Sequence, residues 1–551
     1  MGKRGLNSRG KTEVSENVEP DRCVAWVSKD LSYLNFFFLL IASLFLSLIF
    51  TLRVGWTSLV HDLVSYLAPA VFLLNQDLSP YGTFFDIKPP FLIYSLIPWV
   101  AVFGQSLLSM AFLHGTLLFL HLILPFFIAL LLSRRMSIAW ITFGAQALWI
   151  TSSDAYFGML VTSELLGNVY ALSSILLLLA ASKELKKSSA ALFILSGLLA
   201  GFATLTKEVY VGVAFAVVIG ALLLPSGKRA TSAAFVGLGG LVSIILVLST
   251  LVMTGDLENY WEILLLKSNL FPSPTLGIFI SSLPLLLAQI SDNLAPFIPW
   301  LLLVAFVFLT LGYKKLPRMD RSRIFFGGVT GLSMLFSLTW QAKPMSGHYL
   351  ISAFVPLLLV FPILISSVAS LAKELRPRKA TGISVMAIIL IVFTAIPAPN
   401  ALLAGQKASL EELSNLGTLG TISLETSAED TSTLEALAAK SSCIQVAYGW
   451  AAAANYLAAN RPPCSQFFLV NLILASPELL VQFRNDLILN PPELVVYSPD
   501  GADLSVEDFE SNVFPWRAIV ENCYEETELA NVFVLNYSPS ESIGCFDGFI
   551  R

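Results

Sequence analysis

The sequence has few charged residues, few cysteines before residue 400, and none of the short glycine-rich patterns that bind phosphates. Only 13% of its 551 residues are charged, against roughly 25% in soluble domains. With 56% hydrophobic residues and a mean hydropathy of +0.74, the chain is predicted to be a polytopic membrane protein, and a soluble globular protein is excluded. Without a phosphate loop we expect no nucleotide binding, and no His/Cys cluster has the spacing of a zinc site.

Charge is divided unevenly between two parts of the chain. Residues 1–399 hold 27 Lys or Arg and 18 Asp or Glu, whereas residues 400–551 hold 6 and 20. We therefore predict a basic transmembrane domain at 34–399 followed by an acidic, aqueous domain at 400–551. The acidity of the second domain argues against nucleic acid as its partner.

Apolar runs separated by short polar loops predict about eleven transmembrane helices, each near the ~20 residues that a crossing needs. They lie at 34–52, 107–133, 137–152, 160–182, 189–205, 209–224, 231–253, 294–312, 324–340, 350–371 and 381–397. Loops at alternate ends, together with an N-terminal tail at 1–33, carry 22 of the 27 basic residues. The positive-inside rule makes that side cytoplasmic and places residues 400–551 outside the cytoplasm.

Two amphipathic runs, at 62–75 and 89–104, fall in the first outer loop (53–106). If either of them crossed the membrane, every later basic cluster would change sides. We therefore expect both to be helices that lie in the outer interface of the cell membrane.

The last domain is predicted to be α/β. Strands are expected at 444–447, 467–470, 494–497 and 532–535, and a helix at 451–459. This domain contains Cys443, Cys464, Cys523 and Cys545. The four cysteines permit two disulfides in any of three connectivities, or four free thiols, and the sequence leaves these alternatives open.

The first outer loop holds the strongest candidates for chemistry, because ionisable groups at a membrane face are costly to keep there. Asp62 could take a proton from a hydroxyl group, and burial would raise its pKa towards a useful value. Tyr66 follows one helical turn later and shares its face. The alternative for Asp62 is a helix N-cap; His61 could tune Asp62 or bind substrate, or be a plain interfacial histidine.

Lys88, which precedes Pro89-Pro90, is the second feature of this loop. Proline in the first turn fixes a helix N-terminus, whose free N–H groups together with the lysine predict a phosphate site. The other lone lysines of the predicted outer side, Lys207, Lys267 and Lys343, are also candidate anion ligands. Snorkelling or chance is the alternative for each.

The order of these residues resembles the first outer loop of GT-C glycosyltransferases, most closely the relatives of protein O-mannosyltransferases and aminoarabinose transferases. The shared pattern is Asp62 with Tyr66, then Asp77, Tyr81 and Asp86-x-Lys88-Pro89-Pro90. Further motifs follow in the family's order: Thr162-Ser163-Glu164, the element 201–207 that ends in Lys207, Gly347-His348-Tyr349 with Pro356, and residues 448–450 and 460–463 in the tail.

The resemblance implies a polytopic α-helical GT-C membrane protein with an extracytoplasmic α/β domain. It implies an inverting glycosyltransferase that moves a sugar from a polyprenyl-phosphate donor to a hydroxyl of a lipid, glycan or protein acceptor. Asp62 would be the catalytic base, and Lys88, Lys207, His348 and Tyr349 would bind the donor phosphate. Substrate would also contact His61, Tyr66, Tyr81, Asp86, Asp154, Glu164 and Lys343. No metal or other cofactor is expected; a divalent ion between the phosphate and Asp62, Asp154 or Glu164 is the alternative.

The chain also departs from the family pattern. Leu63 stands where the second acid of a pair is usual, and Lys343 stands where an arginine is common. Two other functions therefore stay open: a transporter or flippase for a lipid-linked sugar, and a non-catalytic subunit of an envelope glycan pathway. The gathering of charges at one face, with no visible internal repeat, argues against the transporter.

Overall fold

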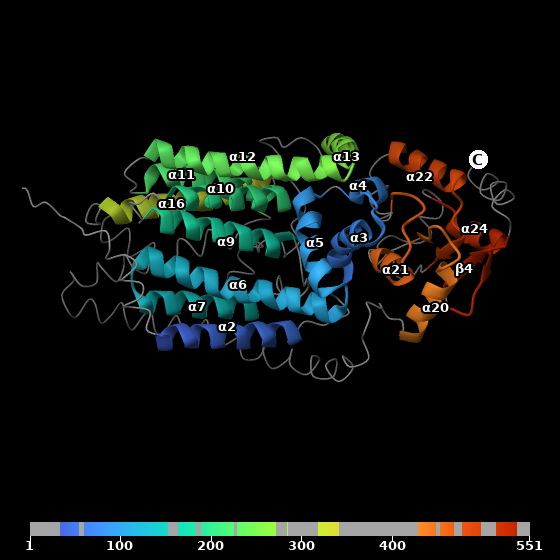
Figure 1. Cartoon of the computed structure of the whole chain (residues 1–551), viewed down its shortest axis with the longest axis horizontal. Helices are drawn as coiled ribbons and strands as arrows, with labels where there is room; N and C mark the ends of the chain where they lie inside the picture. The colour runs from blue at the N-terminus through green and yellow to red at the C-terminus, as the bar shows by residue number, and fades with distance from the viewer. Residues whose placement is uncertain are drawn as a thin grey trace, which may run out of the picture.

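The structure is a computed structural model of the whole chain. It describes residues 33–53, 60–86, 88–152, 163–182, 189–224, 229–270, 284, 318–340, 428–447, 452–467, 477–497, 514–529 and 531–536. In these ranges the chain forms a bundle of long helices, a small domain that contains a sheet, and a group of short helices between them (Figure 1).

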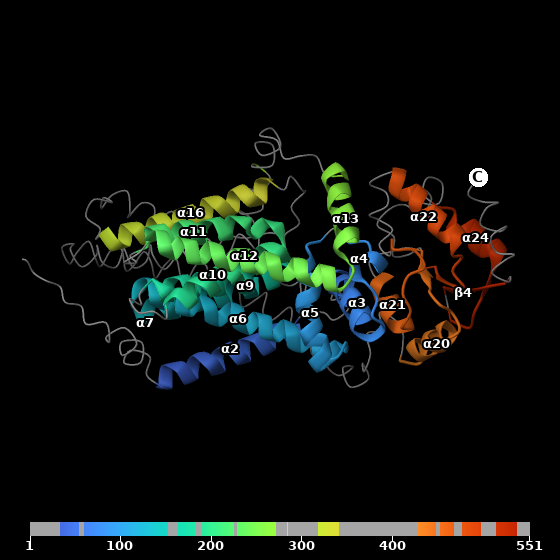
Figure 2. The same cartoon turned by 45° about the horizontal axis from the view of Figure 1, so that its top comes forward.

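The bundle consists of long apolar helices that run side by side (Figures 1 and 2). They are α2 (Tyr33–Arg53), α6 (Leu107–Ser133), α7 (Met136–Ser152), α9 (Ser163–Ala181), α10 (Ser189–Thr206), α11 (Val211–Leu223), α12 (Arg229–Met253) and α16 (Arg318–Trp340). Each coincides with a predicted span, and the predicted spans at 294–312, 350–371 and 381–397 lie outside the described residues. Among the described helices, 5 are long and apolar enough to cross a membrane, so the chain is a multi-pass membrane protein.

Helices α10 and α12 pack closely because small residues lie where they meet. In lipid no hydrophobic driving force holds two helices together, so such close contact is what favours their association. Gly197 and Gly201 on α10 face Gly239 and Ser243 on α12, each pair four residues apart. A Cβ atom on Gly197 would collide with the backbone carbonyl of Val236, and one on Gly239 with that of Ile194. Small residues at this spacing let two backbones approach and gain van der Waals contact.

Three helices lie between the bundle and the tail domain: α3 (Val60–Gln76), α4 (Pro80–Thr83) and α5 (Pro90–Phe103). Figure 1 shows α5 across the end of the bundle, with α3 and α4 beyond it. The two predicted amphipathic helices are thus present and do not extend the bundle. Helix α5 begins at Pro90 with Pro89 as its N-cap, as the Lys-Pro-Pro sequence predicts.

The tail domain is built around a mixed sheet with strand order β1-β2-β4-β3. Strand β1 (Gln445–Val446) is parallel to β2 (Leu494–Val496), whereas β4 (Val532–Leu535) is antiparallel to β2 and to β3 (Tyr524–Glu526). The helices are α20 (Ala428–Ala438), α21 (Ala452–Ala459), α22 (Pro477–Leu489) and α24 (Trp516–Cys523). The predicted α/β class is confirmed; of the predicted strand at 467–470, residue 467 is not in a strand and the rest lies outside the described residues.

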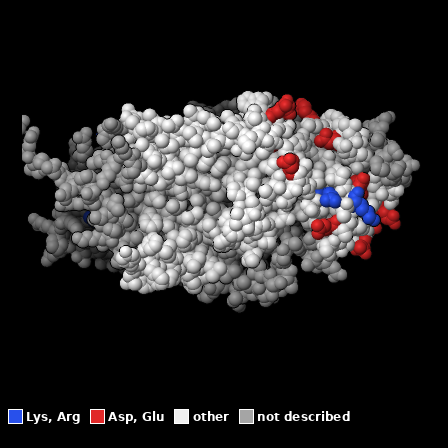
Figure 3. Space-filling model, viewed as in Figure 1, with Lys and Arg blue, Asp and Glu red and all other residues white. Residues whose placement is uncertain are grey.

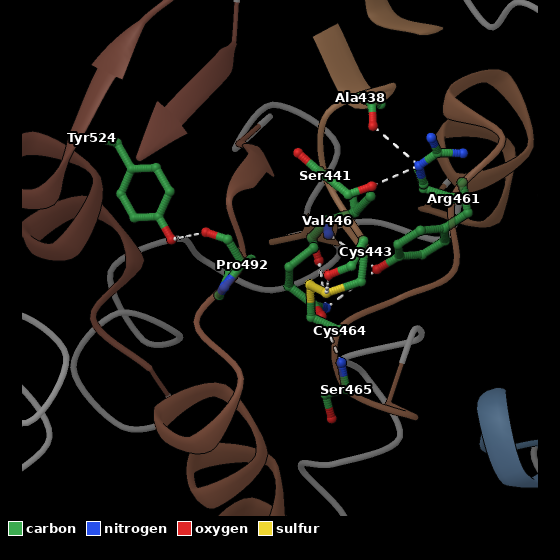
Figure 4. The surroundings of a disulfide bond; sticks show 12 residues. Ala438, Ser441, Cys443, Val446, Arg461, Cys464, Ser465, Pro492 and Tyr524 are labelled. Carbon is green, nitrogen blue, oxygen red and sulfur yellow. Dashed lines mark hydrogen bonds between the residues drawn. A yellow bond between two sulfur atoms is a disulfide. The ribbon is translucent and has the colours of Figure 1, made fainter. Parts of the chain in front are cut away.

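A disulfide holds the start of this domain together (Figure 4). It joins Cys443 to Cys464, with the Cα atoms 5.0 Å apart, and Cys523 is disulfide-bonded as well. Beside it, the Arg461 guanidinium donates to the carbonyls of Ala438 (3.1 Å) and Ser441 (2.7 Å). The sequence left disulfides and free thiols open, and the structure selects disulfides for these three cysteines.

The tail domain contacts the short helices directly. Helix α21 packs on α3, and Gln76 at the end of α3 donates its side-chain amide to the Asn460 carbonyl (3.2 Å). The Phe85 amide donates to the Gln466 carbonyl (2.6 Å), and the rings of Phe85 and Phe467 lie 5.0 Å apart. Because α3 is covered by α5 on one side and by α21 on the other, its residues from Ser65 to Phe72 are buried.

Most of the described charges on the face drawn in Figure 3 gather over the tail domain and near α13 (Leu257–Leu270), and the described part of the bundle is almost entirely white. This distribution matches a bundle surrounded by lipid, with its tail-facing end in water. Helix α13 was not expected from the sequence. It leaves the end of α12 through a turn at Gly255, whose φ of 73° favours glycine.

Candidate functional site

The predicted site residues that the structure describes lie at the tail-facing end of the bundle, in two corners. One corner is the loop between α4 and α5, which carries Lys88. The other is formed by the adjacent ends of α9 and α10, which carry Glu164 and Lys207. The Phe91 ring of α5 stacks on Phe202 of α10 at 4.0 Å and 5°. An aromatic contact therefore joins the helix that follows Lys88 to the helix that ends before Lys207.

The backbone of Lys88 is held on both sides. Its amide donates to Oδ1 of Asp86 (3.1 Å), and its carbonyl accepts a hydrogen bond from the Tyr81 hydroxyl (2.8 Å). Asp86 and Tyr81 are both buried. The sequence predicts substrate contacts for these two residues; the contacts seen here shape the loop, and the substrate contacts stay a prediction.

Burial keeps Tyr81 protonated. Its pKa is raised well above the usual value of 10.0, first by burial and then by the nearby Tyr260 and Asp86. Tyr260, on α13, meets the Tyr81 ring edge-on at 5.0 Å. The Tyr81 hydroxyl is therefore a hydrogen-bond donor at all ordinary pH values, and its bond to the Lys88 carbonyl does not depend on pH.

The Lys88 ammonium lies 4.2 Å from the centre of the Tyr66 ring, within the range of a cation–π contact. Among the side chains that the structure describes, which do not include that of Asp62, Lys88 forms no ion pair. Tyr66 itself is only 1% exposed. An ammonium held against an aromatic face keeps its N–H donors for an anion, as the prediction of a phosphate site requires.

Asp62 lies one helical turn before Tyr66 on α3. Because α3 begins at Val60, Asp62 is in the first turn of the helix, and its alternative role as a cap stays a prediction. The contact between Lys88 and Tyr66 brings Lys88 to the stretch of α3 on which Asp62 lies. The side chains of His61 and Asp62 are outside the described part of the structure.

The second corner contains a buried ion pair between Lys207 and Glu164. The Glu164 side chain is 1% exposed and that of Lys207 is 14% exposed. Ser163 donates its hydroxyl to Oε2 of Glu164 (3.0 Å), and the Tyr210 hydroxyl donates to the Glu164 carbonyl (2.7 Å). The charge of Lys207 is thus already balanced, whereas Lys88 has no acidic partner among the described side chains. Its expected contact with phosphate stays a prediction.

Asp256, at the turn between α12 and α13, was not singled out in the sequence. It is fully buried, and its Oδ1 accepts hydrogen bonds from the Ser79 hydroxyl and from the amides of Tyr81 (2.8 Å) and Gly82 (3.3 Å). Its Oδ2 accepts from the hydroxyls of Tyr94 (2.9 Å) and Thr254 (2.9 Å). No local signal marks Asp256, because an aspartate after Thr-Gly and before a helix is an ordinary turn and cap residue.

Four predicted site residues, Asp154, Lys343, His348 and Tyr349, lie outside the described residues. Within the described ranges no group of three His, Cys, Asp or Glu side chains is placed to hold a metal ion. Metal independence therefore stays a prediction.

Comparison with known proteins gives a match in structure alone. No family model matches the sequence, and no curated protein matches it. The chain is similar to the crystal structure of ArnT from Cupriavidus metallidurans bound to undecaprenyl phosphate, with a TM-score of 0.52 and 13% identity over 92% of this chain and 98% of that one. It also aligns with the archaeal oligosaccharyltransferase AglB from Archaeoglobus fulgidus, in complex with an inhibitory peptide and a dolichol-phosphate, with a TM-score of 0.43 and 11% identity over 93% of this chain and 75% of that one. The likeness to ArnT confirms the predicted GT-C fold.

Proposed function

We propose that this protein is an inverting glycosyltransferase that moves a sugar from a polyprenyl phosphate to an acceptor hydroxyl at the outer face of the membrane. The observation that carries the proposal is the position of the Lys88 ammonium on the Tyr66 ring (4.2 Å), without an ion pair to any side chain that the structure describes, at the tail-facing end of a GT-C fold. A similar fold binds undecaprenyl phosphate in ArnT, which supports a lipid-phosphate donor.

The proposed reaction gives one role to Asp62 and another to Lys88. The acceptor oxygen attacks the anomeric carbon in line with the bond to the phosphate oxygen, which breaks and leaves its electron pair on the phosphate. Asp62 takes the acceptor's proton. The Lys88 ammonium balances the charge that develops on the leaving phosphate, with His348 and Tyr349 as its expected partners. Holding donor and acceptor together supplies much of the acceleration.

The tail domain supports this assignment through its contacts. Because Gln466 bonds the Phe85 amide and α21 packs on α3, the tail lies against the same loop that carries Lys88. We assign it the role of covering the site and selecting the acceptor. The net negative charge of residues 400–551 would disfavour anionic acceptors by charge repulsion.

The test separates binding from chemistry. Membranes that contain the protein are supplied with a panel of radiolabelled undecaprenyl-phosphate sugars, and label is followed into lipid, glycan and protein fractions. Asp62→Asn should abolish transfer yet keep the affinity for undecaprenyl phosphate, whereas Lys88→Gln should weaken that affinity about tenfold or more, the loss expected for a charge-assisted hydrogen bond. Full transfer by Asp62→Asn would remove Asp62 from the mechanism, and unchanged lipid affinity in Lys88→Gln would overturn the proposed phosphate site.

A further inference from the structure

We infer that Asp256 is the positioning residue of the Lys88 loop: one buried carboxylate fixes the elements on both sides of Lys88 and thereby sets where its ammonium stands. The inference rests on the proposed function, since it concerns the lysine that would bind the donor phosphate. It adds a residue that is 168 positions away in the sequence from Lys88 and that does not itself touch substrate.

The two oxygens of Asp256 serve different elements. Oδ1 accepts from the hydroxyl of Ser79 and from the amides of Tyr81 and Gly82, so it holds α4, the element before Lys88. Oδ2 accepts from the hydroxyl of Tyr94, which lies on α5, the element after Lys88. Four donors from the two flanking elements therefore converge on one side chain that is 0% exposed.

The path from Asp256 to Lys88 is short and made of hydrogen bonds. Asp256 fixes the backbone of Tyr81, and the Tyr81 hydroxyl donates to the Lys88 carbonyl (2.8 Å). Beyond that carbonyl the Lys88 side chain reaches the Tyr66 ring on α3. A loop fixed at both ends has few positions for its lysine, and such preorganisation is what favours binding of a developing charge.

A carboxylate suits this place better than a neutral group. All five partners of Asp256 are donors, two of them backbone amides that cannot accept. Hydrogen bonds to an ionised acceptor are shorter and stronger than those between neutral groups. Asparagine would turn an N–H group towards one set of these donors, and alanine would leave the buried amide of Tyr81 without its acceptor, which is costly.

The experiment is a double-mutant cycle with purified full-length protein and undecaprenyl phosphate as the probe; undecaprenol, which lacks the phosphate, reports binding of the chain alone. The variants are Asp256→Asn, Tyr81→Phe and Lys88→Gln, with each of the first two also combined with the third. Glu258→Gln is the matched control, since Glu258 lies two residues from Asp256 and is exposed. Tyr81→Phe keeps the buried ring and removes only the hydrogen bond to the Lys88 carbonyl. It therefore tests the inference even if Asp256→Asn fails to fold.

We expect Asp256→Asn and Tyr81→Phe each to raise the dissociation constant for undecaprenyl phosphate about fivefold, the effect of one lost hydrogen bond. In the Lys88→Gln background neither should raise it further, and undecaprenol binding should be unchanged throughout. A merely structural role would weaken binding equally in both backgrounds, and that result would overturn the inference, as would unchanged affinity in Tyr81→Phe. A different result, unchanged affinity for undecaprenyl phosphate in the Lys88→Gln single variant, would overturn the proposed function and the inference with it.

Discussion

The two lysines at the tail-facing end of the bundle, Lys88 and Lys207, have opposite surroundings. Lys207 is paired with the buried carboxylate of Glu164, whereas Lys88 lies on the Tyr66 ring and forms no ion pair with a described residue. A salt bridge balances a charge inside the protein, while an aromatic face stabilises a cation without neutralising it. The difference fits the proposal that Lys88 binds the donor phosphate, and it leaves the phosphate contact of Lys207 a prediction.

The two corners also differ in how they are built. Glu164 and Lys207 lie at the ends of adjacent helices, α9 and α10, which pack along their length. Lys88 lies in a loop that has no such support. Its position depends on a hydrogen bond donated by Tyr81 and one accepted by Asp86, and on the hydrogen bonds that Asp256 accepts from α4 and α5. The Glu164–Lys207 corner is supported by helix packing, whereas the position of Lys88 depends on a hydrogen-bonded loop.

Removal of Glu164 should have the largest effect on stability. In Glu164→Ala the Lys207 ammonium is left in a partly buried place without its partner, and loss of one member of a buried pair costs about 3–5 kcal/mol. We expect about 3 kcal/mol, because the Lys207 side chain is 14% exposed and water can reach it. Unfolding by denaturant in mixed detergent micelles measures this loss of free energy from the midpoint and the slope of the transition.

Lys88→Met should lower the free energy of unfolding by about 1 kcal/mol or less, the size of a cation–π contact. Equal losses in the two variants would abolish the distinction between the corners.

Removal of both charges of the pair should restore most of the loss. Glu164→Gln with Lys207→Met eliminates the desolvation of two ions, and such replacements are often neutral or stabilising. We expect this double variant to unfold within about 1 kcal/mol of the parent and to bind undecaprenyl phosphate within about twofold of it, since half a kcal/mol is a factor of about two. A loss as large as that of Lys88→Gln would show that Lys207 also contacts the phosphate, as the family resemblance implies.

The comparison of the two corners also shows which features a sequence can reveal. The transmembrane helices could be predicted because each needs a run of ~20 apolar residues, a property of adjacent positions. Lys88 stood out because the two prolines that follow it define a helix start. Glu164 and Lys207 were both identified, but their pairing depends on how α9 and α10 pack, which hydropathy does not encode.

The role of Asp256 and the presence of α13 could not be predicted from the sequence for a related reason. The partners of Asp256 on α4 and α5 lie 162–177 residues earlier in the chain, so no local pattern marks it. Helix α13 mixes exposed apolar residues such as Trp261 with exposed Glu258 and Glu262, and its apolar content falls short of a span. Strand β3, Tyr-Glu-Glu, carries no hydrophobic alternation and is defined by its pairing with β4.

The smallest predicted effect concerns the ring beneath Lys88. Tyr66→Leu removes the aromatic face, and a cation–π contact of about 0.5–1 kcal/mol corresponds to a two- to fivefold weaker binding of undecaprenyl phosphate, because the ammonium is no longer held in place. Tyr66→Phe keeps the face and should bind within about twofold of the parent. In the Lys88→Gln background the leucine and phenylalanine variants should have the same affinity, since no cation is left to be held. If leucine and phenylalanine already bind equally when Lys88 is present, the ring does not hold the ammonium, and the contrast with Lys207 would reduce to the presence or absence of a carboxylate.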